Sequence, residues 1–379
     1  MRAAISNRTR SLSEPSIVFV TRKWPPATGG METYSVRLAE ALAAEEPVEV
    51  IALPGRADGM PPGFAQLMAF PLTVLKRAFA RRSAPRVLHL GDMALWPLAA
   101  LSLAWRGTTV ALSAHGTDVA YHRRGGIRGT LYGAYLKIGA RLLRKAQVIA
   151  NSQATARVAA ETGWHGAAVV PLATDFAAGN PTGLHDGTVL FAGRLVERKG
   201  CGWFVREVLP LLPDGLRLRV AGPGWEARES VVLDHPRVEF LGSLSPERLA
   251  QAYASALCVV VPNIVIPNGE FEGFGLVAVE AAAAGGVVLA ADHGGLRDAV
   301  IDGTTGFLLP CGDAQAWAHA VIRTAGWRQA ERRDFVGRSL TYCREHFRWQ
   351  RVARETLQAY SLGWETAAGT GSTTAECAR

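Results

Sequence analysis

Short runs of aliphatic and β-branched residues recur along the whole chain, and stretches with helical periodicity separate most of them. Runs of this length, bounded by Gly, Pro, Asn and Asp, are typical of buried strands. Because parallel strands need a crossover connection that a helix supplies, the alternation predicts parallel sheets with helices on both faces. The runs read SIVFV, VEVIAL, RVLHL, TTVALS, QVIAN and AAVVPL, and then TVLFAG, LRLRVAG, VEFLG, ALCVVVP, GVVLAA and GFLLP.

The series of strands is interrupted at about residues 172–187, where the sequence LATDFAAGNPTGLHDG is rich in Gly, Pro and Asp. Such a stretch is typical of a linker, so we predict two doubly wound domains. The predicted segments are a flexible leader at 1–15, an N-terminal domain at 16–175, a C-terminal domain at 176–345, a helix at 346–362 that packs back on the first domain, and a flexible tail at 363–379.

Composition excludes several classes of protein. With 379 residues, 49% hydrophobic and 20% charged, the chain is long and apolar enough for two cores and is not disordered. Its five cysteines contain no C-x-x-C pair, which argues against a disulfide framework or a zinc site and favours the cytoplasm. The longest apolar stretch, MALWPLAALSLAW, is too short to span a bilayer. The leader lacks an apolar core, so it is a flexible segment or, alternatively, a transit peptide.

The net charge of +8 is concentrated in the first half, where residues 1–180 hold 21 Lys and Arg against 11 Asp and Glu. A basic surface predicts an anionic partner or an anionic membrane. The alternative is compositional bias, because 36 of the basic residues are Arg and only 5 are Lys.

The loops that follow the apolar runs are the places to search for a site, because doubly wound sheets bind ligands beyond the carboxyl ends of their strands. The first run leads into RKWPPATGGMETYSV, where Gly29 and Gly30 precede a helix. Two glycines let the backbone approach a ligand, and a helix N-terminus attracts anions. The pair predicts an anion site or, alternatively, an ordinary turn. It is not the G-x-G-x-x-G of dinucleotide-binding proteins.

The loop RLVERKG follows the seventh run and places Arg194 at the end of a strand and Lys199 just before a helix. The two cations can converge on a phosphate, or they can belong to a solvated loop. We predict that Arg198, which lies between them, is a solvated cation.

Two carboxylates stand in the stretch EGFGLVAVEAAAAGG, which is otherwise apolar or made of small residues. Glu272 lies in a glycine-flanked loop, and Glu280 lies inside the helix that follows. A buried carboxylate without partners costs several kcal/mol, so Glu280 needs donors. The paired hydroxyls of a ribose would serve, and an internal salt bridge or a backbone cap is the alternative.

A histidine, His115, lies in the sequence SAHGTD at the carboxyl end of another predicted strand. There it faces the ligand site or, alternatively, serves as a turn or core residue. Asp118 has the position of a helix cap.

The motifs GGME, HGTD, GRLVERKG and EGFGLVAVE, in this order, resemble those of glycosyltransferase family 4, whose members are retaining and use nucleotide sugars. The resemblance runs from about residue 16 to 362 and includes the E-x7-E signature. It implies an α/β protein with the GT-B fold, in which two doubly wound Rossmann-like domains face each other across a cleft. The first domain would hold the acceptor and the second the donor.

The resemblance also implies how the donor nucleotide is held. Arg194 and Lys199 would bind the diphosphate, and Gly29 and Gly30 would close over it from the other domain. Glu280 would grip the ribose.

At the reacting sugar, the resemblance implies two candidate catalytic residues. Glu272 would lie against the transferred sugar, and His115 would contact it near the reacting carbon. Phe274, Gly275 and Leu276 would present backbone groups to sugar and phosphate. No nucleophile of the enzyme is evident, so a front-face mechanism is expected.

We expect no metal and no cofactor besides the co-substrate, a nucleotide-diphosphate sugar of UDP or GDP type. Bond cleavage puts negative charge on the diphosphate, and fixed cations can meet it. The sequence has no D-x-D pair to hold a divalent metal. The proline-flanked approach PNIVIPNGEFEGFG before Glu272 is longer than usual for the family, which leaves the donor base and sugar open.

An apolar stripe in the stretch GGIRGTLYGAYLKIGARLLRKAQ places Leu131, Tyr135, Ile138 and Leu142 on one helical face beside several cations. We predict that this stripe faces the core of its own domain. The alternative is a basic amphipathic helix that lies on an anionic membrane. With the basic stretch at 76–86, the charge favours an anionic or lipid-linked saccharide acceptor, as in polysaccharide or glycolipid synthesis at the inner face of the cell membrane.

Two other functions fit parts of the sequence. A GT-B-like sugar-nucleotide epimerase or hydrolase would use the same diphosphate grip without an acceptor. A basic nucleic-acid-binding protein would need aromatic residues interleaved with Lys and Arg, or a known reading motif, and neither is evident. The motifs therefore favour a glycosyltransferase without a nucleic-acid partner.

Overall fold

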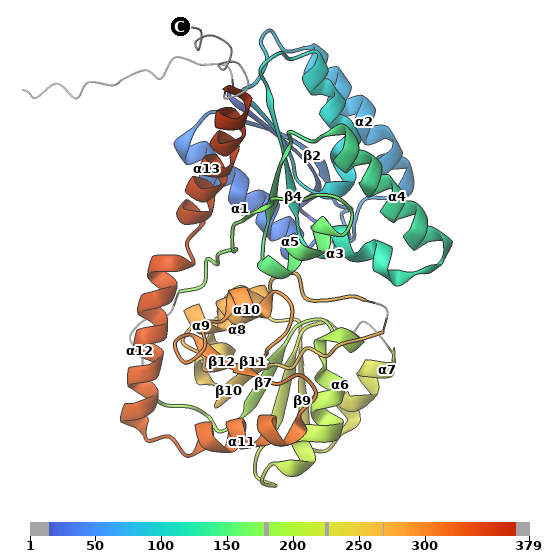
Figure 1. Cartoon of the computed structure of the whole chain (residues 1–379). Helices are drawn as coiled ribbons and strands as arrows, with labels where there is room; N and C mark the ends of the chain where they lie inside the picture. The colour runs from blue at the N-terminus through green and yellow to red at the C-terminus, as the bar shows by residue number, and fades with distance from the viewer. Residues whose placement is uncertain (1–14, 178–181, 224–226, 268, 369–379) are drawn as a thin grey trace, which may run out of the picture. The chain divides into compact units, whose positions relative to one another are not determined.

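The computed structural model of the chain describes residues 15–177, 182–223, 227–267 and 269–368 and contains two parallel sheets flanked by helices (Figure 1). Each of the twelve apolar runs forms one strand, which confirms the predicted α/β fold with two doubly wound sheets. The described parts of the predicted linker form neither helix nor strand. Most of the predicted leader and tail lies outside the described residues.

The first sheet has the strand order β2-β1-β3-β4-β5-β6. Aliphatic pairs set its register, since Ile17 on β1 lies opposite Val48 on one side and Val87 on the other. Its strands are β1 (Ile17–Trp24), β2 (Val48–Pro54), β3 (Val87–Leu90), β4 (Thr109–Ala114), β5 (Gln147–Ala150) and β6 (Ala168–Val169).

The second sheet has the order β12-β11-β10-β7-β8-β9, so the direction of winding reverses between β7 and β10. Val259 on β10 pairs with Leu190 on β7 and with Val288 on β11. Doubly wound sheets bind ligands beyond the strand ends at such a reversal, which directs attention to the loops after β7 and β10. The strands are β7 (Val189–Ala192), β8 (Leu218–Ala221), β9 (Val238–Gly242), β10 (Cys258–Val261), β11 (Val288–Ala291) and β12 (Gly306–Leu309).

Some of the helices bury an apolar face, and some begin at a polar side-chain cap. In α1, Tyr34, Leu38 and Leu42 recur at helical spacing and are buried. The side chains of Ser152 and Asp313 cap α5 and α11. The longer helices are α1 (Gly30–Glu45), α2 (Phe64–Phe79), α4 (Gly126–Leu142), α5 (Gln153–Ala160), α8 (Pro246–Ser255), α9 (Leu276–Ala283), α11 (Ala314–Ala325), α12 (Gln329–His346) and α13 (Trp349–Ala368). The shorter ones are α3 (Thr117–Ala120), α6 (Cys201–Trp203), α7 (Ala227–Ser230) and α10 (Leu296–Ala299).

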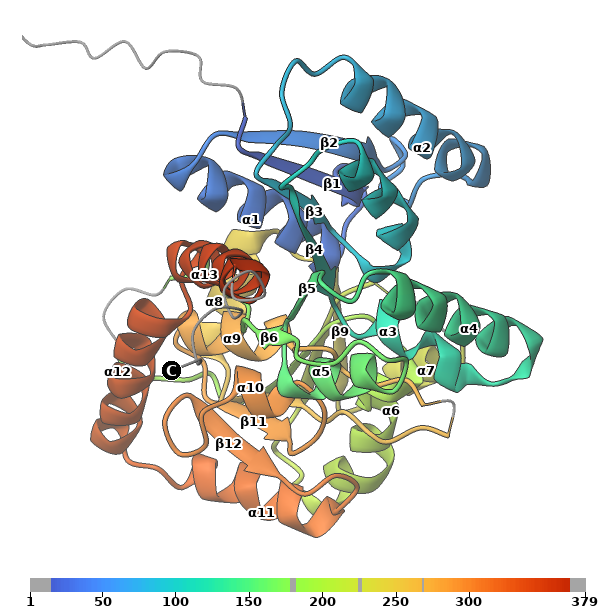
Figure 2. The same ribbon diagram turned by 45° about the horizontal axis from the view of Figure 1, so that its top comes forward.

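Packing divides the chain into two compact units. Of the described residues, one unit contains those up to Leu112, residues 145–147 and those from Leu357 onward, and the other contains those within 113–144 and 148–356. Within the first unit, the hydroxyl of Tyr360 on α13 lies 2.7 Å from Nδ1 of His89 on β3, and both side chains are buried. Figure 2 shows the backbone of α13 and of β3. The helix α13 continues past the predicted end at residue 362.

Candidate functional site

Close backbone contacts lock the loops after β7 and β10 together. The amide of Ile264 donates to the carbonyl of Arg198 at 3.1 Å. Gly200 has a φ of 72°, and a Cβ atom there would lie 1.9 Å from the carbonyl oxygen of Pro262. Only glycine fits this crossing. The crossing holds Lys199 beside the loop that leads to Glu272.

Glu272 is the centre of a cluster of donors. Its Oε2 atom lies 2.5 Å from Nζ of Lys199, 2.8 Å from a guanidinium nitrogen of Arg198 and 3.1 Å from Nδ2 of Asn263. Its Oε1 atom has no hydrogen bond or ion pair with any residue that the structure describes. The side chain of Arg198 is only 13% exposed, so the prediction that it is a solvated cation is wrong.

The cluster fixes the charge of Glu272. Burial would raise the pKa of its carboxyl, but Lys199 and Arg198 outweigh burial and lower that pKa to about 2. Burial lowers the pKa of Lys199, Glu272 raises it, and the neighbouring Arg198 and Arg194 lower it again, which leaves it below the ordinary value. Arg194 is exposed at the end of β7 and acts on Lys199 through space. The loop after β7 therefore gathers three cations near one ionised carboxylate.

Glu280 lies in α9 without a counter-ion among the described residues, and it is partly exposed. Burial raises its pKa from 4.5 to about 7, Lys199 and the hydroxyl of Tyr253 oppose this rise, and Asp175 adds to it. Tyr253 is buried, and its hydroxyl forms no hydrogen bond of regular geometry with any described residue. The internal salt bridge that was the alternative for Glu280 is thus not formed in the described part of the chain.

The start of α9 forms a tight turn between the two glutamates. Phe274 is buried, and Gly275 has a φ of 98° immediately before the helix begins at Leu276. A Cβ atom on Gly275 would lie 2.4 Å from Cδ2 of Leu296, so the position requires glycine. The first N–H groups of a helix lack partners within it, so the turn offers backbone donors near Glu272.

His115 packs against the loop of Glu272. A Cβ atom on Gly273 would lie 2.0 Å from the carbonyl oxygen of His115, and Thr155 donates its hydroxyl to the carbonyl of Gly273 at 3.2 Å. The carboxylate of Asp118 accepts the backbone N–H of His115 at 2.8 Å. The N-cap of α3 is Gly116 and no side chain caps the helix, so the prediction that Asp118 is a helix cap is wrong. Asp118 instead holds the backbone of His115 next to the loop of Glu272.

Gly29 and Gly30 belong to the other unit, where they stand at the start of α1. A Cβ atom on Gly29 would lie 2.6 Å from Oε2 of Glu32, and the other carboxylate oxygen of Glu32 lies 3.6 Å from Nζ of Lys23. A carboxylate of the chain itself therefore lies at this helix N-terminus. The role of the two glycines at a diphosphate stays a prediction.

The apolar stripe on α4 is exposed. Leu131, Ile138 and Leu142 are 65%, 49% and 69% exposed, and Ile127 at the start of the helix is 80% exposed. The buried side of α4 consists of three glycines and Leu136. Small residues let that side pack closely, so the large apolar residues point outward. The prediction that this stripe faces the core is wrong.

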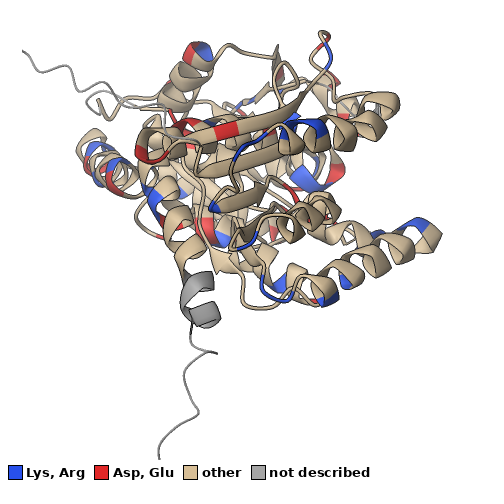
Figure 3. Cartoon of the chain, turned by 90° about the horizontal axis from the view of Figure 1, so that it is seen from above, with Lys and Arg blue, Asp and Glu red and all other residues tan. Residues whose placement is uncertain are grey.

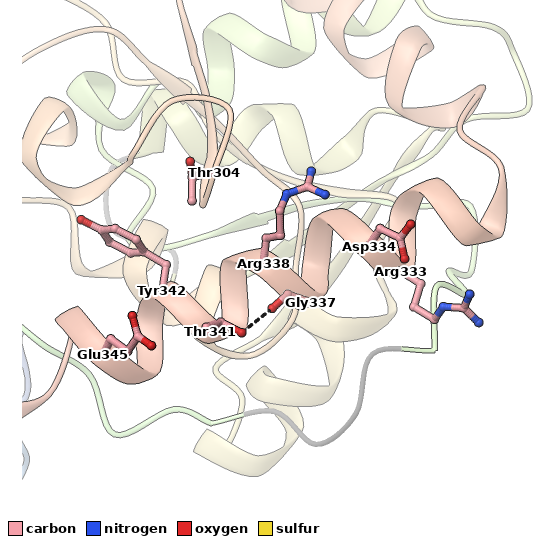
Figure 4. Close-up of a pocket in the computed structure, with 8 residues that line it drawn as sticks. All are labelled: Thr304, Arg333, Asp334, Gly337, Arg338, Thr341, Tyr342 and Glu345. Carbon is pink, nitrogen blue, oxygen red and sulfur yellow. Dashed lines mark hydrogen bonds between the residues drawn. The ribbon is translucent and has the colours of Figure 1, made fainter.

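A separate hollow lies along α12 (Figure 4). It is lined by polar and charged side chains that include Arg338, Tyr342 and Glu345, together with Thr304. The hydroxyl of Thr341 in its wall donates to the carbonyl of Gly337 on the same helix. None of the predicted site residues lines this hollow.

Sequence reasoning missed Asn263 and Tyr253. Asn263 follows Pro262 directly at the carboxyl end of β10, so the rule that ligands bind beyond strand ends identifies its position. Tyr253 lies on α8, and no local signal connects it with Glu280. Within the described ranges, no group of three or more His, Cys, Asp or Glu side chains is arranged to hold a metal ion.

Two family models match this chain. One, described as Glycosyltransferase Family 4, matches residues 28–177, and the other, described as Glycosyl transferases group 1, matches residues 186–326. The two matches together contain every predicted site residue.

The curated relatives include proteins named D-inositol 3-phosphate glycosyltransferase. The one from Nocardia farcinica is 36% identical over 192 residues, which cover 47% of this chain and 41% of the relative. The one from Rhodococcus erythropolis is 37% identical over 189 residues, which cover 45% of this chain and 40% of the relative. The chain thus matches less than half the length of these relatives.

Solved structures resemble the chain over nearly its whole length. Anabaena HepE, in complex with UDP and glucose, has a TM-score of 0.67 and 18% identity and covers 92% of this chain and 100% of its own. Sucrose-phosphate synthase from Thermosynechococcus elongatus has a TM-score of 0.70 and 20% identity and covers 93% of this chain and 100% of its own. These likenesses show that the fold is of the GT-B type.

Proposed function

Because this chain belongs to glycosyltransferase family 4, we propose that it moves a hexosyl group from a nucleotide-diphosphate sugar to an acceptor hydroxyl. One observation carries the proposal. Arg194, Arg198 and Lys199 gather near Glu272 and Glu280 where the winding of the second sheet reverses, which is where such sheets bind ligands.

Arg194 and Lys199 are proposed to hold the donor diphosphate. Negative charge grows on the diphosphate as the sugar–phosphate bond breaks, and cations already in place stabilise it without reorganisation. Lys199 is buried, so its charge acts in a medium of lower dielectric constant than water. We propose that these cations provide the counter-charge and that transfer proceeds without a metal.

Glu280 is proposed to accept hydrogen bonds from the two hydroxyls of the ribose. The carboxylate is partly exposed and forms no ion pair with a described residue. Two hydroxyl donors suit a carboxylate, which has acceptor sites on both oxygens. They also favour its ionised form, which burial disfavours here.

Glu272 and His115 are proposed to lie at the transferred sugar, with Phe274, Gly275 and Leu276 supplying backbone contacts. Oε2 of Glu272 is held by three donors, while Oε1 has no partner among the described residues and can accept a sugar hydroxyl. A carboxylate held in this way is a binding group. Retention by a front-face mechanism is consistent with that role.

The comparisons support a particular choice of donor and acceptor to test first. The Anabaena structure contains UDP and glucose, so UDP sugars precede GDP sugars as candidate donors. The curated relatives are named for inositol 3-phosphate, an anionic molecule. We propose an anionic or lipid-linked saccharide acceptor for this chain, in the synthesis of a cell-surface polysaccharide or glycolipid.

Peripheral contact with an anionic membrane is proposed for the exposed face of α4. No Asp or Glu occurs between residues 119 and 160, and the exposed cations Arg128, Lys137 and Arg141 accompany the apolar stripe (basic residues are blue in Figure 3). Exposed apolar side chains beside cations suit the interface of an anionic bilayer. No helix in the described ranges has the length and apolarity needed to cross a membrane.

The helix α2 of the other unit has the same character. Phe64, Met68, Leu72 and Phe79 fall on one side of it and are 61–78% exposed. A flotation assay with vesicles that contain anionic lipid tests the contact. We expect salt-sensitive binding that is lost when Arg128, Lys137 and Arg141 are replaced with Glu. Equal flotation with neutral vesicles would refute it.

The enzymatic proposal is tested by a thermal-shift panel of nucleoside diphosphates and their sugars, followed by transfer assays. A ligand at 100 times its dissociation constant adds about 2.7 kcal/mol to the free energy of unfolding. We expect a shift with one class of nucleotide and slow turnover in the absence of an acceptor. Rapid turnover without an acceptor would favour the epimerase or hydrolase. No shift with any nucleotide would reject the donor site.

A further inference from the structure

Lys199, the cation proposed to hold the donor diphosphate, is already paired with a carboxylate of the protein itself. The Nζ atom of Lys199 lies 2.5 Å from Oε2 of Glu272, and both side chains are largely buried at 11% and 13% exposure. Buried charges are stable only when they are paired, so the two groups satisfy each other in the donor-free protein. A diphosphate that binds Lys199 must therefore compete with Glu272 or share its cation.

Glu272 has two further donors that do not depend on Lys199. Arg198 donates to the same oxygen at 2.8 Å, and Nδ2 of Asn263 donates to it at 3.1 Å. The carbonyl of Arg198 accepts the amide of Ile264, and the carbonyl of Asn263 accepts the thiol of Cys311 at 3.2 Å. Both donors are thus fixed at the backbone, and they can hold the carboxylate after Lys199 has left it.

The charges also favour such an exchange. Arg194 is exposed and acts on Lys199 from the same loop. A diphosphate that replaces the Glu272 carboxylate on Lys199 is therefore stabilised by both cations, Lys199 and Arg194. A diphosphate also offers several oxygens to charge-assisted donors, whereas Glu272 uses one oxygen for all of its contacts.

We propose that the donor binds by anion exchange on Lys199: its diphosphate displaces the Glu272 carboxylate from the ammonium group, and Arg198 and Asn263 then hold Glu272 at the transferred sugar. The exchange rests on the proposed function, because it needs a diphosphate-bearing donor. It makes Arg198 and Asn263 positioning residues. It also makes Glu272 a competitor of the nucleoside diphosphate product, which helps that product to leave.

The test is isothermal titration of the whole chain with UDP and with GDP. Replacing Glu272 with Gln removes the competing charge and keeps the size of the side chain, so Glu272→Gln should bind the nucleoside diphosphate on the order of tenfold more tightly than the wild type. The same variant should lose sugar transfer. A gain in affinity with a loss of turnover is not expected from structural damage.

The matched control is Glu270→Gln. Glu270 pairs with Arg124 and lies 3.7 Å from Arg198, and no ion pair joins it to Lys199 in the described structure. The control also removes one negative charge from this region, but it does not vacate Lys199. Its affinity should therefore stay within about twofold of the wild type.

The outcomes separate this proposal from the proposed function. If the wild type and both variants bind neither UDP nor GDP, the donor site itself is rejected, and the exchange with it. If the wild type binds but Glu272→Gln binds equally or more weakly, the exchange is wrong while the donor site stands. An equal gain in Glu270→Gln would attribute the effect to overall charge and would also overturn the exchange.

A second measurement covers the case in which Glu272→Gln does not fold, since it leaves a buried ammonium without its counter-ion. In a crystal structure of the wild type with UDP, Nζ of Lys199 should lie about 3 Å from a phosphate oxygen and beyond about 4 Å from Glu272. Arg198 should still contact Glu272. A Lys199–Glu272 pair that persists beside bound UDP would refute the exchange.

Discussion

Replacing Glu280 with Gln should make the donor-free protein more stable above neutral pH. Burial raises the pKa of this carboxyl from 4.5 to about 7 in the folded chain. Between these two values the folded protein keeps a proton that the unfolded chain has lost, so the free energy of unfolding falls as pH rises through this window. At about 1.4 kcal/mol per pKa unit, the loss amounts to about 3 kcal/mol by pH 8. Gln imitates the protonated form and avoids this loss.

Urea unfolding at pH 5, 6, 7 and 8 measures the effect. The variant should be more stable than the wild type by less than about 1 kcal/mol at pH 5 and by about 3 kcal/mol at pH 8. The control is Glu331→Gln on α12, which changes an exposed carboxylate and should follow the wild type at every pH. The reasoning is refuted if Glu280→Gln shows the same dependence on pH as the wild type.

Three further predictions concern the donor site and its support. Replacing Lys199 with Ala should lower kcat/KM by about 10²–10³, because one preorganised cation is lost at the diphosphate; steady-state rates that stay within threefold would contradict this role. Gly273→Ala should lower the free energy of unfolding in urea by more than about 2 kcal/mol, because its Cβ atom would lie 2.0 Å from the carbonyl oxygen of His115. The control is Gly215→Ala, whose Cβ atom meets no atom within 4 Å. UDP binding at pH 7 should release about half a proton, because Glu280 ionises to accept the ribose hydroxyls. The enthalpy of UDP binding should therefore differ between buffers of different ionisation enthalpy, and equal enthalpies would argue against this role of Glu280.

Much of the fold was predictable because its signals are local. Each apolar run is bounded by turn residues and became one strand, and the order of strands and helices is enough to predict parallel sheets. Gly200 and Gly275 illustrate the limit of this reasoning. Their presence in the sequence indicates turns, but the carbonyl of Pro262 and the side chain of Leu296 that require glycine there are distant in sequence.

The composition of the donor site was predictable in part. Arg194, Lys199, Glu272 and Glu280 were identified from strand ends and from acids in an apolar helix. The partners of Glu272 were not predictable, because Arg198 comes from the loop after β7 and its burial depends on a carboxylate located after β10.

The surface of α4 shows a different limit. A stripe of Leu and Ile at helical spacing indicates an amphipathic helix, but it does not tell which face is buried. Here the glycines of α4 form the buried side, because their small size lets the helix approach its neighbours closely. Glycines at helical spacing opposite an apolar stripe therefore indicate that the glycine side of the helix is buried and that the stripe is exposed.

The most direct test of the donor site is a crystal structure of the chain with a bound nucleoside diphosphate. The account predicts both ribose hydroxyls within about 3 Å of the Glu280 carboxylate and the diphosphate in contact with Arg194 and Lys199. A nucleotide bound elsewhere, or a Glu280 side chain that contacts only protein groups while the nucleotide is present, would contradict it.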